Sequence, residues 1–176
     1  YGFGFDDFYC NNSNIENIEI ENKEKINILI THATLDAGNN AEKNYNILSS
    51  KRLKEKNFDY IALGHIHKPQ ILIRDNAAYA GALEPVDRND LGDHGYIEGH
   101  LENGRLKTNF VPFACRSYEQ ILLMLREDST QASLEDMLKA DLANKGRMNI
   151  YRIVIQGTRA PELLLLPERL KSFGYV

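Results

Sequence analysis

Two short apolar runs stand out in the first half of the chain. Residues 26–32 read Ile-Asn-Ile-Leu-Ile-Thr-His, and residues 59–64 read Asp-Tyr-Ile-Ala-Leu-Gly. Short, β-branched and almost uninterrupted runs of this kind are typical of strands that are buried on both faces. We therefore predict two buried strands at these positions.

A polar and amphipathic stretch separates the two runs. Asn40 is placed to cap a helix over residues 41–56, with Tyr45 and Leu48 on its inner face. The order strand, helix, strand predicts a right-handed crossover between two parallel neighbouring strands.

The following segments favour antiparallel pairing. Residues 70–74 and 77–81 are short apolar runs around a polar turn. Asn103-Gly104 is a strong signal for a type I′ hairpin turn. Counting outward from this turn pairs Leu101 with Leu106 and Ile97 with Phe110, and places His100 on the opposite, solvated face.

The pattern changes near residue 115. Residues 118–126 and 149–156 alternate as strands, and a helix lies between them. Ser133 and Asp136 resemble a capping box at the start of this helix, and Gly146 ends it. Four side chains then fall on one helical face: Leu134, Met137, Leu138 and Leu142. We expect a mixed α/β (α+β) fold with two domains, residues 1–115 and 116–176.

Composition and charge exclude several classes of protein. The chain has 176 residues, of which 43% are hydrophobic and 26% charged, which is ordinary for a globular protein. A net charge of −4 excludes a polycation that coats nucleic acid by charge alone. Cys10 and Cys115 are too few for a disulfide scaffold and fit a reducing, cytoplasmic location, with Cys115 packed in an apolar context. No apolar run approaches the length of a membrane span.

Three histidines carry the sharpest chemical signal. His32 ends the first predicted strand, and His65 and His67 follow the second. Because side chains alternate in extended backbone, His-x-His turns both imidazoles to one side. The carboxyl ends of parallel strands meet at one edge of a sheet, so we expect the three imidazoles to converge as metal ligands. The alternative is a pair of loop histidines without a ligand role and a core histidine at position 32.

These residues resemble a known family. Ile28–His32 followed by Asp59–Pro69, with its Gly-His-Ile-His, resembles the C-terminal half of a calcineurin-like metallophosphoesterase. The stretch Tyr79–Asp87 and the following His94–Tyr96 are similar to the SbcD-type DNA repair exonucleases. The resemblance covers roughly residues 1–126.

The resemblance implies a fold and a metal site. The fold would be the C-terminal half of a metallophosphoesterase β-sandwich flanked by helices, followed by the start of a small α/β capping domain. The cofactors would be two divalent ions, usually Mn²⁺, with His32 and His65 ligating one ion and His67 the other. The family's Asp-x-His, Gly-Asp-x-x-Asp and Gly-Asn-His ligand motifs do not occur in this sequence. With its opening at Tyr1, this predicts a fragment that is inactive in isolation.

The leading functional hypothesis is a metal-dependent DNA exonuclease that acts in DNA repair. Its implied partners are DNA, an SbcC-like coiled-coil ATPase and a second copy of the protein, with no membrane. Two alternatives remain: a metallophosphoesterase acting on another phosphodiester or phosphoester, and a non-catalytic scaffold or binding module. The sequence assigns no catalytic or substrate-binding residue beyond the three histidines.

Overall fold

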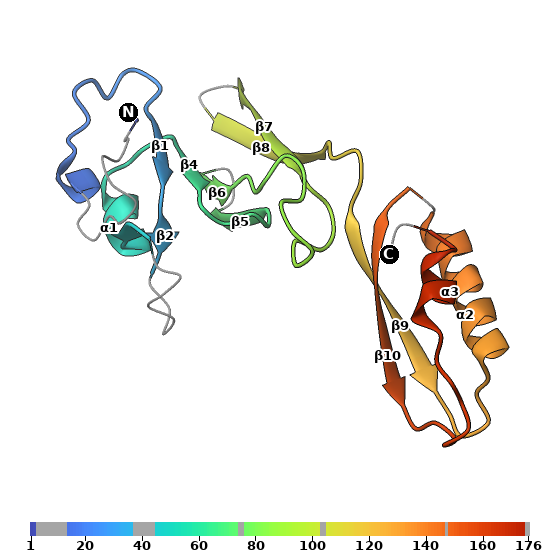
Figure 1. Ribbon diagram of the computed structural model, residues 1–176. Coiled ribbons are helices and arrows are strands. Elements are labelled where there is room, and N and C mark those ends of the chain that lie inside the picture. The colour runs from blue at the N-terminus through green and yellow to red at the C-terminus, as the bar shows by residue number, and fades with distance from the viewer. Residues whose placement is uncertain (3–13, 37–44, 74–75, 103–104, 147, 175–176) are drawn as a thin grey trace. The chain divides into compact units, whose positions relative to one another are not determined.

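The computed structural model describes residues 1–2, 14–36, 45–73, 76–102, 105–146 and 148–174. The chain forms two compact units (Figure 1). The first unit comprises Tyr1–Leu83 and His94–Phe113, and the second comprises Glu84–Asp93 and Ala114–Val176. Strands and helices occur together, so the predicted mixed α/β class is confirmed.

A four-stranded sheet forms the centre of the first unit, in the order β1-β4-β6-β5. Its strands are β1 (Ile28–His32), β4 (Tyr60–Gly64), β6 (Ala77–Tyr79) and β5 (Gln70–Ile73). The first three run parallel, and β5 pairs antiparallel with β6. The predicted parallel pair is therefore confirmed, and its register places His32 beside Gly64.

The helix predicted over residues 41–56 is confirmed over Ser50–Glu55 and is wrong for the described residues before it. There, β3 (Ile47–Leu48) pairs in parallel with β2 (Thr34–Leu35), and helix α1 spans only Ser50–Glu55. Asn46 has a φ of +46°, a left-handed conformation that no helix accommodates and that asparagine tolerates better than most residues. The predicted cap, Asn40, lies outside the described residues. A short 3₁₀ helix, η1 (Asn14–Asn17), precedes β1.

The prediction that β1 is buried on both faces is also wrong. Leu29 is 0% exposed, whereas Ile30 beside it is 61% exposed. The buried face packs with Ile61 and Leu63 of β4 and with Leu53 of α1. Ile28 and Ile30 lie on the exposed face and Leu29 on the buried one, so apolar residues on both faces conceal the period-two pattern of a one-sided strand.

A separate hairpin completes the first unit. It joins β7 (Gly95–Glu102) to β8 (Arg105–Pro112) in antiparallel pairing. Leu101 lies opposite Leu106, and Ile97 lies opposite Phe110, which confirms the predicted register. His100 is exposed, as predicted, and the turn at residues 103–104 lies outside the described residues.

The second unit is a strand–helix–strand arrangement. Strands β9 (Tyr118–Leu125) and β10 (Ile150–Gly157) pair in parallel, and α2 (Gln131–Lys145) connects them. Helices α2 and α3 (Pro167–Lys171) lie on the same side of the strand pair (Figure 1). The core between them contains Ile121, Leu123, Leu134, Leu138, Leu142 and Tyr151. Among the described residues, no helix is long and apolar enough to cross a membrane.

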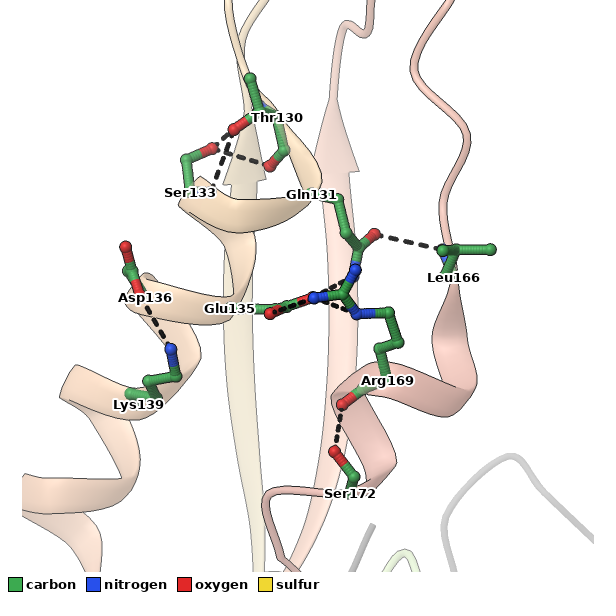
Figure 2. A network of polar contacts seen from close by, with 9 residues as sticks. All are labelled: Thr130, Gln131, Ser133, Glu135, Asp136, Lys139, Leu166, Arg169 and Ser172. Carbon is green, nitrogen blue, oxygen red and sulfur yellow. Dashed lines mark hydrogen bonds and ion pairs between the residues drawn. The ribbon is translucent and has the colours of Figure 1, made fainter.

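The N-cap of helix α2 lies three residues before the predicted cap, Ser133. Thr130 is the N-cap, and its Oγ1 accepts a hydrogen bond from the Ser133 N–H at 3.1 Å (Figure 2). The Thr130 N–H donates in return to Ser133 Oγ at 2.9 Å, which completes a capping box one turn earlier. Asp136 instead pairs with Lys139 at 3.0 Å. Gly146 ends the helix, as predicted.

A buried carboxylate fastens α3 to α2. Glu135 is only 7% exposed, and both of its oxygens face the Arg169 guanidinium at 2.8 and 3.0 Å (Figure 2). Gln131 also donates to Glu135 at 3.0 Å and accepts from the Leu166 N–H at 3.1 Å. This network fixes the C-terminal segment through a charge-assisted, two-pronged contact.

Two predictions of burial fail in this unit. Met137 was placed on the inner face of the helix but is 38% exposed, whereas Glu135 is 7% exposed and turns inward to Arg169. Cys115 is exposed rather than packed. Its backbone N–H donates to Glu84 Oε1 at 2.9 Å, which holds the segment at the surface.

Candidate metal site

Two of the three predicted histidines meet at the carboxyl ends of β1 and β4. His32 is the last residue of β1, and His65 directly follows β4. His32 Nε2 and His65 Nδ1 lie 3.2 Å apart, and the ring planes cross at 77°. The parallel register therefore places two imidazole nitrogens side by side, as expected from adjacent strand ends.

Gly64 provides the space for this contact. A Cβ at position 64 would lie 2.9 Å from His32 Nδ1, closer than side-chain carbons approach a ring. The absence of a side chain at the neighbouring register position therefore allows the His32 ring to lie across the end of β4.

We expect Gly64→Ala to move the His32 ring while the fold stays intact. His32 is exposed, so its ring can rotate toward solvent at small cost to the free energy of unfolding. The contact between His32 and His65 would be lost, and with it the paired nitrogens. Ring-to-ring NMR cross-peaks and a thermal melt measure the two effects. Unchanged cross-peaks between the two rings in the variant would contradict the claim that the His32 ring needs the space left by Gly64.

The backbone at His65 is not extended, contrary to the prediction for His-x-His. Its φ is +101°, a conformation that residues with a side chain rarely adopt. Strained backbone of this kind costs about 1–3 kcal/mol and is concentrated at functional sites. The turn, rather than strand alternation, brings the His65 imidazole to His32.

His67 does not join this contact directly. Its side chain is exposed, and its backbone oxygen accepts a hydrogen bond from the Ala82 N–H at 2.8 Å. Within the described ranges, no three His, Cys, Asp or Glu side chains lie close enough to hold one metal ion. The structure thus assembles a pair of imidazoles, and the predicted three-histidine cluster is not formed by these residues.

Sequence reasoning missed two residues that support the pair. The Tyr45 ring stacks on His65 with centroids 5.9 Å apart and meets His32 edge-on at 5.5 Å. Asn46 is 1% exposed, and its side-chain amide donates to the His32 carbonyl at 2.9 Å. The signal for this role was the Tyr-Asn pair just before the apolar Ile47–Leu48, since asparagine commonly adopts left-handed turns.

Tyr79 of β6 fixes the chain just beyond His32. Its hydroxyl donates to the Ala33 carbonyl at 2.8 Å and accepts from the Leu35 N–H at 3.0 Å. Burial raises the pKa of Tyr79, so the hydroxyl stays protonated and keeps both bonds near neutral pH. The end of β1 is therefore held from β6 as well as from β4.

The electrostatic setting favours the neutral form of His32. Partial desolvation lowers the pKa of the His32 imidazole, and the coulombic interactions with His65 and His67 lower it further. Neutral imidazole is the form that offers a lone pair to a metal ion.

The comparison with known proteins decides the family-level interpretation. No family model matches the chain. Over 139 residues the chain is 32% identical to the uncharacterized metallophosphoesterase YhaO of Bacillus subtilis (strain 168). The aligned segment covers 76% of this chain. This chain is homologous to part of a metallophosphoesterase. It spans about a third of the relative's length, 34%.

Metallophosphoesterases generally use divalent metal ions, and the histidine pair fits part of such a site. Imidazole nitrogens bind transition metals at about 2.0–2.1 Å, so two nitrogens 3.2 Å apart are able to share one ion. A metal ion needs further donors, and the described residues supply no third side chain to this pair. The metallophosphoesterase homology thus agrees with a site of which His32 and His65 form one side.

Proposed function

We propose that this chain provides part of the metal site of a hydrolase that cleaves the phosphodiester backbone of DNA. One observation carries the proposal: His32 Nε2 and His65 Nδ1 lie 3.2 Å apart at neighbouring strand ends. Homology to a metallophosphoesterase supports phosphoester hydrolysis as the reaction class.

The residues of the site have two proposed roles, to bind the metal ion and to position the side chains that bind it. His32 and His65 would hold a divalent ion, proposed to be Mn²⁺, and His67 would contribute to a second ion. A bound ion of this kind supplies Lewis-acid chemistry and makes water acidic enough to act as a nucleophile near neutral pH. Gly64 leaves room for the His32 ring, and Tyr45 contacts both imidazoles of the pair.

The choice of DNA rests on a narrower observation. The stretch Tyr79–Asp87 resembles the SbcD-type exonucleases, and from it we propose DNA repair as the process. An SbcC-like coiled-coil ATPase and a second copy of the protein are the proposed partners. A metallophosphoesterase acting on another phosphoester remains the competing proposal, and substrate comparison separates the two.

The test uses the protein made from the complete gene that contains this sequence. Manganese-dependent cleavage of a labelled DNA duplex and of a small phosphodiester would be measured side by side. We expect chelator-sensitive DNA cleavage that falls at least a hundredfold in His32→Ala and in His65→Ala. His100→Ala is the matched control, because it removes an exposed imidazole from the β7–β8 hairpin.

The outcomes are distinct. Wild-type activity in both site variants would overturn the ligand roles. Cleavage of the small ester without cleavage of DNA would overturn the nuclease proposal and leave the hydrolase. The isolated 176-residue chain serves as a further arm, for which we propose no activity, since neutral imidazoles bring no negative charge to hold two dications together.

A further inference from the structure

The second unit contains a pocket that the proposed function does not use. It has a volume of about 300 Å³. Six residues line it: Arg88, Tyr118, Ile150, Tyr151, Arg152 and Ile153. All of them belong to the second unit, so the pocket is defined within one compact body.

The pocket forms where the loop of residues 84–93 meets the first residues of β9. Leu91 bridges to Tyr118, and the Gly92 N–H donates to the Tyr118 carbonyl at 3.1 Å. Tyr118 in turn lies opposite Ile150 at the start of β10. Asp90 shapes the loop, because its Oδ2 accepts from the Val86 N–H at 3.0 Å. Arg88 is thereby held beside the paired ends of two strands.

Charge in the pocket is one-sided. Its two charged residues, Arg88 and Arg152, are both cationic. Arg152 is held by a neutral partner, with its Nε donating to Gln120 Oε1 at 3.2 Å. Among the residues that the structure describes, neither guanidinium forms an ion pair with a carboxylate. A bound anion would find two guanidinium groups in the lining of one pocket.

The remaining lining is aromatic and aliphatic. Tyr118 offers an aromatic ring, and Ile150, its partner in the strand register, offers apolar surface. Guanidinium groups bind phosphate through paired hydrogen bonds, and aromatic side chains stack on nucleobases. The volume of about 300 Å³ is at the lower end of small-ligand pockets, which suits one nucleotide.

We propose that this pocket binds a nucleotide. The phosphate would lie between Arg88 and Arg152, and the base would lie against Tyr118 and Ile150. The ligand is a free mononucleotide or the terminal nucleotide of a strand, which share this chemistry. The site does not include the histidine pair, so nucleotide binding is tested independently of the proposed metal chemistry.

The test is a titration of the 176-residue chain with adenosine 5′-monophosphate, followed by calorimetry. We expect saturable binding of one nucleotide per chain. Arg88→Gln and Arg152→Gln should each raise the dissociation constant about tenfold or more, because each removes a charge-assisted contact. Arg126→Gln is the matched control: it makes the same charge change at an exposed arginine beyond the other end of β9 and should leave the affinity unchanged.

Further probes separate the two halves of the ligand. Adenosine and inorganic phosphate should each bind more weakly than the mononucleotide, and Tyr118→Leu should weaken nucleotide binding more than phosphate binding. His65→Ala should leave nucleotide affinity unchanged, which distinguishes this site from the metal site. A 5′-phosphorylated dinucleotide that binds more tightly than the mononucleotide would identify a strand end as the source.

Two results would overturn the proposal. The first is an affinity for the mononucleotide that is the same in the wild type and both pocket arginine variants. The second is phosphate binding as tight as nucleotide binding, which would leave an anion site without base recognition. Circular dichroism of each variant confirms that the fold is retained, and Arg152→Lys offers a second variant that keeps the charge and removes the planar fork.

Discussion

Leu138→Ala is expected to lower the free energy of unfolding by about 2–5 kcal/mol. Leu138 is 0% exposed and lies in the core between α2 and the β9–β10 pair, with Ile121 and Leu123. Truncation removes buried apolar surface and leaves a cavity that the surrounding strands fill only in part. Urea unfolding followed by circular dichroism measures the change.

Met137 provides the matched control, one residue earlier on the same helix. It is 38% exposed, so Met137→Ala should cost less than about 1 kcal/mol. Equal losses in the two variants would contradict the orientation of α2. The comparison also tests the corrected helix face, since the sequence had placed both residues inside.

Gly81→Ala is expected to cost about 2–5 kcal/mol and to displace the loop that carries His67. Gly81 has a φ of +80°, which disfavours any residue with a Cβ. An added Cβ would also lie 2.6 Å from the His67 carbonyl oxygen and 2.9 Å from the ring of Pro69. Because backbone atoms and a proline ring move little, the loop itself must shift.

Gly92→Ala separates the cost of the positive φ from the cost of the close contact at the added Cβ. Gly92 has a φ of +93°, but nothing lies within 4 Å of its added Cβ. This variant should therefore show only the conformational cost, about 1–2 kcal/mol. If Gly81→Ala is no more destabilising than Gly92→Ala, the close approach of His67 to Gly81 is contradicted. Paired thermal melts and the NMR shifts of His67 provide the measurement.

The parallel pair and the hairpin were predictable because local signals specify them. Residues 28–32 and 60–64 are short β-branched or apolar runs, and the Asn103-Gly104 sequence signal predicts the register that β7 and β8 adopt. The crossover was not predictable, because its helical periodicity competes with a left-handed turn at Asn46 that the chain adopts to pair Ile47 with Thr34. Local propensity gave way there to tertiary pairing.

The start of α2 shows a different limit. Thr130 and Ser133 both carry hydroxyls suited to a cap, and the reciprocal bonds between them use both. Local sequence does not decide which of the two comes first. The Glu135–Arg169 contact joins residues 34 apart, so no pattern along the helix reveals that this carboxylate is buried.

At the site, the contact between His32 and His65 was predictable from the strand topology. The residues that surround the pair were not. His32 and Gly64 are register partners, which brings the next residue, His65, within reach. The positive φ of His65 and the ring contacts of Tyr45 depend on how the crossover folds back, which the sequence does not state. The resemblance supplied the ligand roles, and these stay predictions.

The most direct test of the account is whether His32 and His65 bind one ion together. The measurement is a Mn²⁺ titration of the isotopically labelled chain, with the ring signals of each histidine followed by NMR. We predict that the signals of His32 and His65 broaden together at low Mn²⁺, well before those of His100, and that His32→Ala abolishes the early broadening at His65. Broadening of His32 and His65 no earlier than that of His100, or early broadening of His65 that survives in His32→Ala, would contradict a shared metal site.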